Sequence, residues 1–255
     1  SAATVKYLFV PEGGFDTFIT AAGTANKETL TRFGYPKFDF LNGMLGVKAD
    51  MKIGEAAELT HATVDLTQAA INADAISWNK PQNTPAALDI TAEKKNGVLV
   101  IPSFHLQADN INAKGSARLN PALTSIEQLQ MDAFTLGNTN LNKLIYETGE
   151  SGMRLDVTGK SVDVSGYMSG DSSDFSFEHF PAIDFNADID QVIMSGGQAL
   201  TNVKGGLQCT KKICASANIA GVSGGKPFHF RILRNPKGKR QLSIRAENAG
   251  AFLRA

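Results

Sequence analysis

The chain has 255 residues, of which 42% are apolar and 20% charged, with a formal net charge of zero. This composition supports a folded core and excludes a disordered chain. It contains no run of about 18 apolar residues and no opening signal pattern, which excludes a transmembrane helix. We therefore expect any export signal or membrane anchor to lie outside this sequence, in a larger parent protein.

The first elements along the chain are a short helix and a long strand. Residues 26–33 carry Leu30 and Phe33 at helical spacing, with Asn26 as N-cap and Gly34 as the stop, which predicts a helix. Apolar side chains then alternate with polar ones from Leu45 to Ile53. That period of two predicts a strand with one apolar and one charged face.

Alternation continues along most of the remaining sequence and predicts about fourteen strands. The alternating runs cover residues 59–66, 69–78, 88–92, 98–101, 104–119, 153–157, 162–164, 183–189, 200–207, 213–219, 228–233 and 241–246. Residues 139–147 instead place Leu141, Leu144 and Ile145 at helical spacing, and residues 248–254 suggest a last short helix. Intervals between strands are too short for crossover helices, so we predict an all-β antiparallel meander rather than a βαβ fold.

Gly, Ser and Asp accumulate between Gly166 and Asp174. This soft boundary divides the chain into a lobe of residues 1–167, with helices near 26–33 and 139–147, and a lobe of residues 168–255 that continues the same sheet.

Cys209 and Cys214 are the only cysteines, and four residues separate them between two predicted strands. No second pair and no nearby histidine accompany them, so we expect a hairpin disulfide rather than a zinc site. A disulfide would indicate an oxidising compartment, either the periplasm or the exterior.

Ten Lys and Arg residues and no acidic residue occur between Gln191 and Ala246. Such a stretch favours anionic partners, which could be phospholipid headgroups or nucleic acid, and it is also typical of a solvated flank without a specific partner. Only Phe228 and Phe230 are interleaved with these charges, so we expect no nucleic acid. The residues assigned to anionic headgroups or a membrane surface are Lys226, Arg231, Lys237, Lys239 and Arg240.

Motifs of catalysis are missing from the sequence, which has no GxSxG, Walker loop, HExxH or GxGxxG motif after a strand. The four histidines are scattered. Asp184, Asp188 and Asp190 alternate along one predicted strand, where we expect a solvated outer face rather than a calcium loop. We predict no enzyme, no metal and no cofactor.

A sheet with one apolar face must cover that face. It can close into a barrel, pack on a second sheet as a sandwich, or curl into a half-pipe covered by a ligand. Three short helices are too few to cover it, and flexible aliphatic side chains suit acyl chains because methylene burial is non-directional. The residues we assign to lipid contact are Leu45, Val47, Met51, Ile53, Leu106, Ile111, Leu119 and Met131.

Three stretches resemble the C-terminal region of AsmA-like proteins of the YhdP/TamB type. Residues 25–53 resemble that family's helix, Phe-Gly-x-Pro turn and long strand. Residues 64–88 share its LT-x-A strand, Trp78, a Lys-Pro pair and a second Pro-Ala, while residues 246–255 resemble its Ala-Gly-x-x-Leu-Arg close.

The resemblance implies a large parent protein anchored in the inner membrane of a Gram-negative envelope, with this segment in the periplasm. The family's bridge-like members guide phospholipids along a β groove and support outer-membrane lipid homeostasis. The alternative that we retain is a structural module that pairs through its sheet edges with other parts of its parent or with partner proteins.

Overall fold

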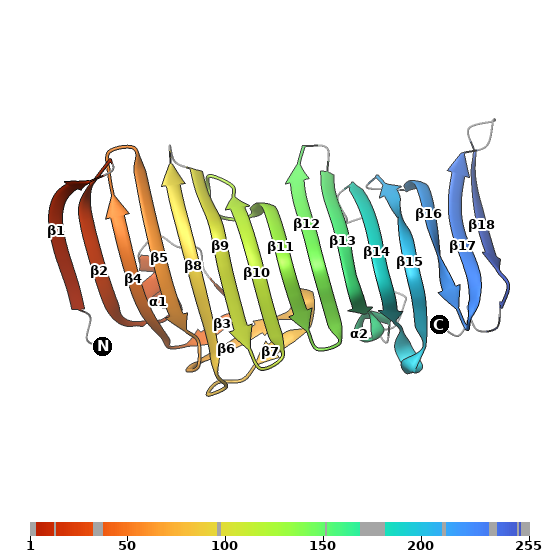
Figure 1. Cartoon of the computed structure of the whole chain (residues 1–255), viewed down its shortest axis with the longest axis horizontal. Coiled ribbons are helices and arrows are strands. Elements are labelled where there is room, and N and C mark those ends of the chain that lie inside the picture. Colours follow the sequence, from red (N-terminus) through yellow and green to blue (C-terminus); the bar gives the residue numbers. More distant parts are fainter. Residues whose placement is uncertain are drawn as a thin grey trace. The chain divides into compact units, whose positions relative to one another are not determined.

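The computed structural model describes residues 4–12, 14–32, 38–95, 98–150, 152–168, 182–210, 213–234, 239–248 and 250 (Figure 1). The helices are α1 (Lys27–Arg32), α2 (Ser165–Met168), η1 (Asp74–Ile76) and η4 (Ser195–Gly197). The strands are β1 (Thr4–Glu12), β2 (Phe15–Ala25), β3 (Leu41–Gly43), β4 (Leu45–Ile53), β5 (Ala57–Asp65), β6 (Ala69–Ala73), β7 (Trp78–Lys80), β8 (Ala86–Lys95), β9 (Val98–Ala108), β10 (Ile111–Leu119), β11 (Ile126–Leu136), β12 (Thr139–Gly149), β13 (Gly152–Asp163), β14 (Ile183–Ile193), β15 (Ala199–Cys209), β16 (Cys214–Ser223), β17 (Lys226–Arg234) and β18 (Arg240–Ala246).

Fifteen of these strands form one sheet in the order β1-β2-β4-β5-β8 to β18. The sheet is not closed, and β1 and β18 are its outermost described strands. The prediction of an all-β, predominantly antiparallel fold is confirmed, and the barrel alternative is wrong. The chain divides into two compact units, residues 1–129 (unit 1) and 130–255 (unit 2). The lobe boundary expected at residues 167/168 instead falls inside unit 2.

Helix α1 precedes β4 as the sequence predicted. The side-chain oxygen of Asn26 accepts hydrogen bonds from the backbone N–H of Thr29 at 2.9 Å and from its hydroxyl at 2.8 Å. Asn26 therefore caps the first turn of the helix. In β4, Leu45 to Ile53 alternate as expected, and the strand pairs with β2 and β5 in continuous registers.

A second sheet of three short strands, in the order β3-β6-β7, lies in unit 1. The sequence predicted one strand over residues 69–78, but η1 interrupts it and Ser77 adopts a φ of 52°. Figure 1 shows β3, β6 and β7 crossing the lower ends of β8, β9 and β10. Residues at those ends are buried, including Ala86, Ile111 and Ala113. The small sheet therefore forms a second layer over one end of the large sheet.

The helix predicted over residues 139–147 is wrong, because these residues form β12. The pairing of β12 with β13 shifts register between Asn140 and Leu141 and again between Leu141 and Lys143. Such bulges insert residues into a strand. The inserted residue turns Leu141 and Leu144 to the same face although they are three positions apart, which mimics helical spacing in the sequence.

Strands β13 and β14 are a parallel pair, with Met153 opposite Ile183 and Val157 opposite Ala187. Parallel neighbours require the chain to return along the sheet before the second strand begins. The Gly, Ser and Asp residues that suggested a lobe boundary belong to this return connection, of which residues 169–181 lie outside the described residues. Most of the helix predicted at 248–254 also lies outside them.

Candidate functional site

One face of the large sheet in unit 1 is apolar. Because opposed residues in paired strands share a face, the registers place Leu88 beside Val64 and Leu106, and Ile90 beside Phe104. We define the apolar face of unit 1 by eight half-buried side chains on β4, β8, β9 and β10: Val47, Met51, Ile53, Leu88, Ile90, Phe104, Leu106 and Leu119. The opposite face of β4 carries Lys48, Asp50 and Lys52, all exposed.

Cover over the apolar face comes from few elements. Outside the large sheet, the described residues of unit 1 form only α1, η1 and the small sheet. Leu45 and Ile111, both predicted to contact lipid, are only 4% and 3% exposed at the covered end. Val47, Met51, Ile53, Leu106 and Leu119 remain half-buried on the same face. Unit 1 is therefore not a sandwich of two sheets, because the small sheet covers only one end of the apolar face of the large sheet.

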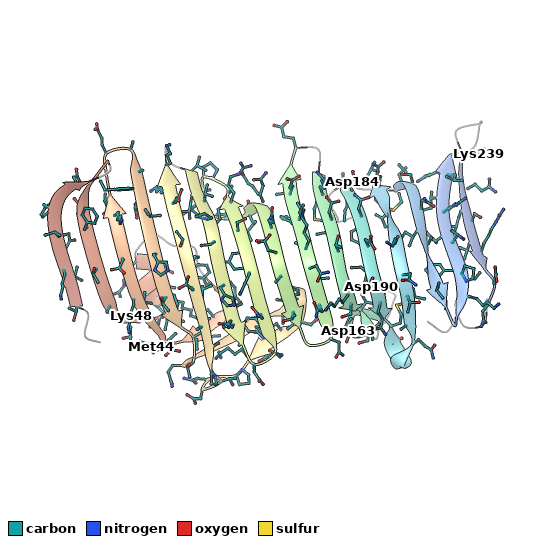
Figure 2. The ribbon with its side chains drawn as sticks, viewed as in Figure 1. Met44, Lys48, Asp163, Asp184, Asp190 and Lys239 are labelled. Atoms are coloured by element: carbon teal, nitrogen blue, oxygen red, sulfur yellow. A yellow bond between two sulfur atoms is a disulfide. The ribbon has the colours of Figure 1, made fainter. Side chains whose placement is uncertain are left out.

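Met131, the remaining predicted lipid contact, lies half-buried on β11 in unit 2. Met44, in the link between β3 and β4, is 39% exposed and is labelled with Lys48 of β4 in Figure 2.

Trp78 and Lys80 attach the small sheet to its surroundings. Trp78 is 4% exposed, and its Nε1–H donates to Oδ1 of Asn110 at 3.0 Å. Lys80 is 2% exposed, and its Nζ donates to the carbonyl oxygens of Ala69 at 2.7 Å, Pro81 at 3.0 Å and Thr67 at 3.5 Å. Burial lowers the pKa of Lys80, and the Asp65 carboxylate opposes that shift. Trp78 therefore links the small sheet to the turn between β9 and β10, and Lys80 links β7 to the backbone around β6.

Of the three carboxylates predicted to form a solvated outer face, two are exposed, and Asp184 is half-buried. On β14, Asp188 and Asp190 are exposed, and Lys204 Nζ lies 3.0 Å from Asp188 Oδ2. Figure 2 shows Asp184 and Asp190 at different heights along the strand. Among the described residues, no group of three His, Cys, Asp or Glu side chains could hold a metal ion.

The residues predicted to bind anionic headgroups do not form one cluster. Lys226 begins β17, while Arg240 lies opposite Arg234 at the other end of that strand. Arg231 lies on the other face and donates from Nε to Asn218 Oδ1 at 3.2 Å. Lys239 is exposed, and Lys237 lies outside the described residues.

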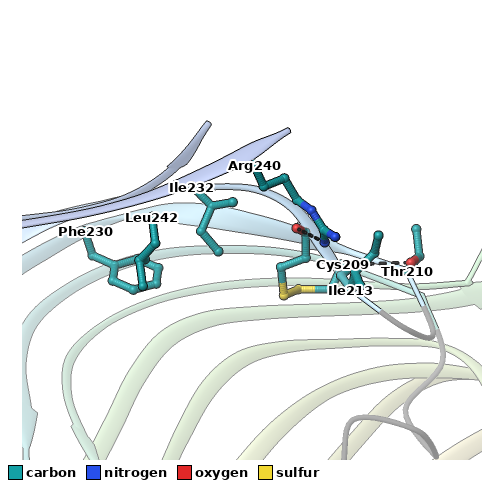
Figure 3. A pocket seen from close by; sticks show the side chains of 8 residues that line it. Cys209, Thr210, Ile213, Phe230, Ile232, Arg240 and Leu242 are labelled. Atoms are coloured by element: carbon teal, nitrogen blue, oxygen red, sulfur yellow. Dashed lines mark hydrogen bonds between the residues drawn. A yellow bond between two sulfur atoms is a disulfide. The ribbon is translucent and has the colours of Figure 1, made fainter. Parts of the chain in front are cut away.

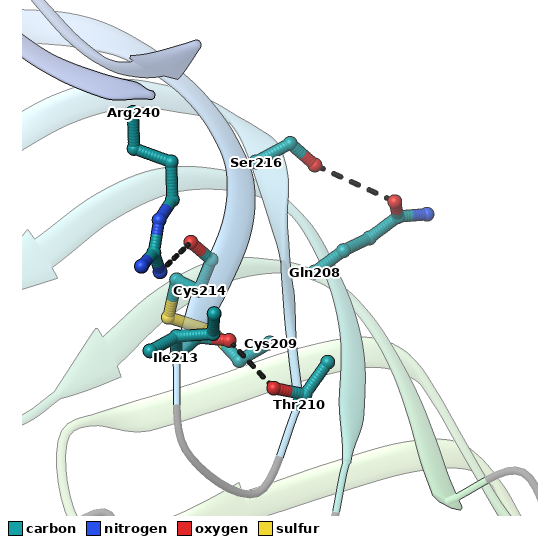
Figure 4. Close-up of a disulfide and its surroundings, with 7 residues drawn as sticks. All are labelled: Gln208, Cys209, Thr210, Ile213, Cys214, Ser216 and Arg240. Atoms are coloured by element: carbon teal, nitrogen blue, oxygen red, sulfur yellow. Dashed lines mark hydrogen bonds between the residues drawn. A yellow bond between two sulfur atoms is a disulfide. The ribbon is translucent and has the colours of Figure 1, made fainter. Parts of the chain in front are cut away.

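The predicted disulfide between Cys209 and Cys214 is confirmed. The two cysteines are directly opposed on β15 and β16, with their Cα atoms 3.7 Å apart. Figure 4 shows Arg240 reaching over the hairpin, where its Nη1 donates to the Cys214 carbonyl oxygen at 3.3 Å.

Beside this disulfide, unit 2 holds a pocket of about 500 Å³ that the sequence did not reveal. Figure 3 shows Phe230, Ile232 and Leu242 pointing to the same side of β17 and β18. The lining residues are Cys209, Thr210, Ile213, Cys214, Phe230, Ile232, Arg240 and Leu242. Among these described lining residues Arg240 is the only charged one, so the described walls of the pocket are apolar and carry one cationic group.

None of the helices in the described part of the chain has both the length and the apolar character needed to cross a membrane. In comparisons with known proteins, no protein-family model, no curated protein and no solved structure matches this chain.

Proposed function

We propose that the apolar face of unit 1 holds lipid acyl chains, in a periplasmic segment of a membrane-anchored AsmA-like protein that supports outer-membrane lipid homeostasis. The observation that carries this proposal is the row of half-buried aliphatic side chains beyond the small sheet, such as Met51 and Ile53. Burial of each acyl methylene against such a surface contributes about 0.8 kcal/mol. No directed polar contact is needed, so acyl chains of differing length fit the same face.

Two further features support the proposal. The Cys209–Cys214 disulfide is compatible with an oxidising compartment such as the periplasm. The resemblance of residues 25–53, 64–88 and 246–255 to AsmA-like proteins implies a phospholipid cargo and an envelope location. The proposal is one of binding and guiding.

Lipid extraction after incubation with phospholipid vesicles tests this proposal. We expect the purified chain to retain phospholipid through gel filtration. The double variant Met51→Glu/Leu106→Glu places charges on the apolar face and should retain at least fivefold less, because each charge must be desolvated beside acyl chains.

The matched control, Lys48→Glu/Lys114→Glu, changes exposed side chains on the opposite face of β4 and β10 and should retain as much lipid as the wild type. The proposal fails if the wild-type chain retains no phospholipid or if both double variants lose it equally.

A second candidate function is edge pairing with a strand of the parent protein or a partner. β1 lies at one edge of the described sheet and exposes apolar side chains on both faces: Tyr7 is 62% exposed, Phe9 74% and Leu8 58%. An edge of this kind is a template for another strand. Concentration-dependent association that Leu8→Lys abolishes would favour this function, whereas a strictly monomeric chain would argue against pairing with itself.

A further inference from the structure

The pocket beside the disulfide lies on one face of unit 2. The registers place Phe230 opposite Ile244 and Ile232 opposite Leu242, so these side chains share the face to which Arg240, two positions before Leu242, also belongs. Its volume of about 500 Å³ lies within the range of small-molecule sites.

The pocket walls are apolar and partly open to solvent. Leu242 is 59% exposed and Ile213 is 44% exposed, although both are large aliphatic side chains. Phe230 and Ile232 line the wall between them and are half-buried. An apolar ligand would remove these side chains from water at about 25 cal/mol per Å² of buried apolar surface.

Arg240 supplies the polar end of the pocket. Its guanidinium group carries five N–H donors, and Nη1 donates to the Cys214 carbonyl oxygen at 3.3 Å. No described carboxylate pairs with it, and the sequence contains no acidic residue between Gln191 and Ala246. An uncompensated guanidinium group beside an apolar pocket is complementary to a carboxylate or phosphate, which it can bind through two N–H groups.

We propose that this pocket binds an anionic single-chain amphiphile, with the anionic oxygens at Arg240 and the acyl chain along Phe230, Ile232 and Leu242. The site goes beyond the proposed function because it lies in unit 2 and predicts a discrete stoichiometry and a headgroup charge. A free fatty acid and a lysophospholipid share the required chemistry.

Isothermal titration of the whole chain with palmitate, palmitoyl-lysophosphatidylglycerol and hexadecanol, all below their micellar concentrations, tests the site. We expect a site of one equivalent for an anionic ligand, which differs from acyl-chain binding in unit 1 by its dependence on Arg240. Arg240→Gln should weaken that binding at least tenfold and change hexadecanol binding less than twofold. Arg245→Gln, on the opposite face of β18, is the matched control and should change neither. Tighter binding of palmitate would identify a free fatty acid as the ligand, and tighter binding of the lysolipid would identify a phospholipid product.

A second variant probes the apolar wall. Leu242→Asp should abolish the site of one equivalent in unit 2 for all three ligands, and any remaining binding should be that of the apolar face of unit 1. The far-ultraviolet circular dichroism should be unchanged, because Leu242 is 59% exposed and contributes little to the core. The Met51→Glu/Leu106→Glu variant of unit 1 should keep the Arg240-dependent palmitate site of unit 2 with unchanged affinity. The inference is overturned if neither anionic ligand binds, or if Arg240→Gln binds both with unchanged affinity. If neither anionic ligand binds while unit 1 still retains phospholipid, the inference about the pocket is refuted and the proposed function of unit 1 is not.

Discussion

Lys80 provides a sharp prediction because its ammonium group is buried among backbone carbonyls. We consider Lys80→Met, which keeps the length of the aliphatic stem and removes the charged donor. Nζ makes two hydrogen bonds of 3.0 Å or shorter, to Ala69 and Pro81, and a third at 3.5 Å to Thr67. Without the ammonium group, these carbonyl oxygens lose a donor in a place where the side chain is only 2% exposed.

The magnitude follows from two opposing contributions. Hydrogen bonds from a charged donor contribute roughly 1.5–3 kcal/mol each, so the two short ones give about 3–6 kcal/mol. Removing the charge also removes the desolvation penalty of the ammonium group, which offsets part of that gain. We expect a net loss of about 2–4 kcal/mol in the free energy of unfolding of unit 1, a large share of the 5–15 kcal/mol typical of a domain.

The single tryptophan makes this loss measurable in unit 1. Trp78 lies in β7 with Lys80 and is 4% exposed, so its fluorescence in urea reports the small sheet and its attachment. The control is Lys48→Met, which removes an exposed lysine from β4 and should change the free energy of unfolding by less than about 0.5 kcal/mol. If Lys80→Met unfolds at the same urea concentration as the wild type, Lys80 does not hold the small sheet in place.

Three further predictions concern unit 2. Gly205→Ala should lower the free energy of unfolding by at least about 2 kcal/mol more than Gly225→Ala does. Both residues have positive φ, but a Cβ at Gly205 would lie 1.9 Å from the Asn218 carbonyl oxygen, whereas nothing lies within 4 Å of a Cβ at Gly225. Equal midpoints of unfolding in urea for the two variants would contradict this. Reducing the Cys209–Cys214 bond should cost about 2 kcal/mol, visible as a lower melting temperature in dithiothreitol, and an unchanged temperature would count against it. Hydrogen bonds from Ser165 and Asn138 lower the pKa of Asp163 below 3.8. The ionised carboxylate therefore stabilises the folded state above that pH, and this stabilisation is lost as the pH falls through the folded-state pKa. Asp163→Asn should lose less stability than the wild type on acidification from roughly pH 5 to pH 2.5, and equal losses in both proteins would refute the assignment.

Local patterns predicted the elements that depend on local chemistry. The period-two alternation of Leu45 to Ile53 gives β4 because one face is half-buried and the other is solvated. The cap at Asn26 and the opposed cysteines likewise act over a few residues, so both were predicted from spacing alone.

Long-range pairing decided the elements that sequence patterns did not predict. Leu141 and Leu144 have helical spacing, but cross-strand pairing with β13 and a bulge make them strand residues. The small sheet escaped prediction because its burial comes from contacts between Trp78 and Asn110 and around Lys80, which are distant in sequence or unusual in chemistry. The pocket was missed because it forms only when β15, β16, β17 and β18 are side by side, although Cys209, Cys214 and Arg240 had each been singled out.

Site-specific photo-cross-linking tests the proposed lipid function most directly. The photoreactive residue p-benzoylphenylalanine would replace Met51 in one variant and Lys48 in another, and each would be illuminated with vesicles of radiolabelled phospholipid. Because these positions lie on opposite faces of β4, we expect a lipid adduct at position 51 and none at position 48. Equal labelling at both positions, or no adduct at position 51, would contradict acyl-chain binding on the apolar face.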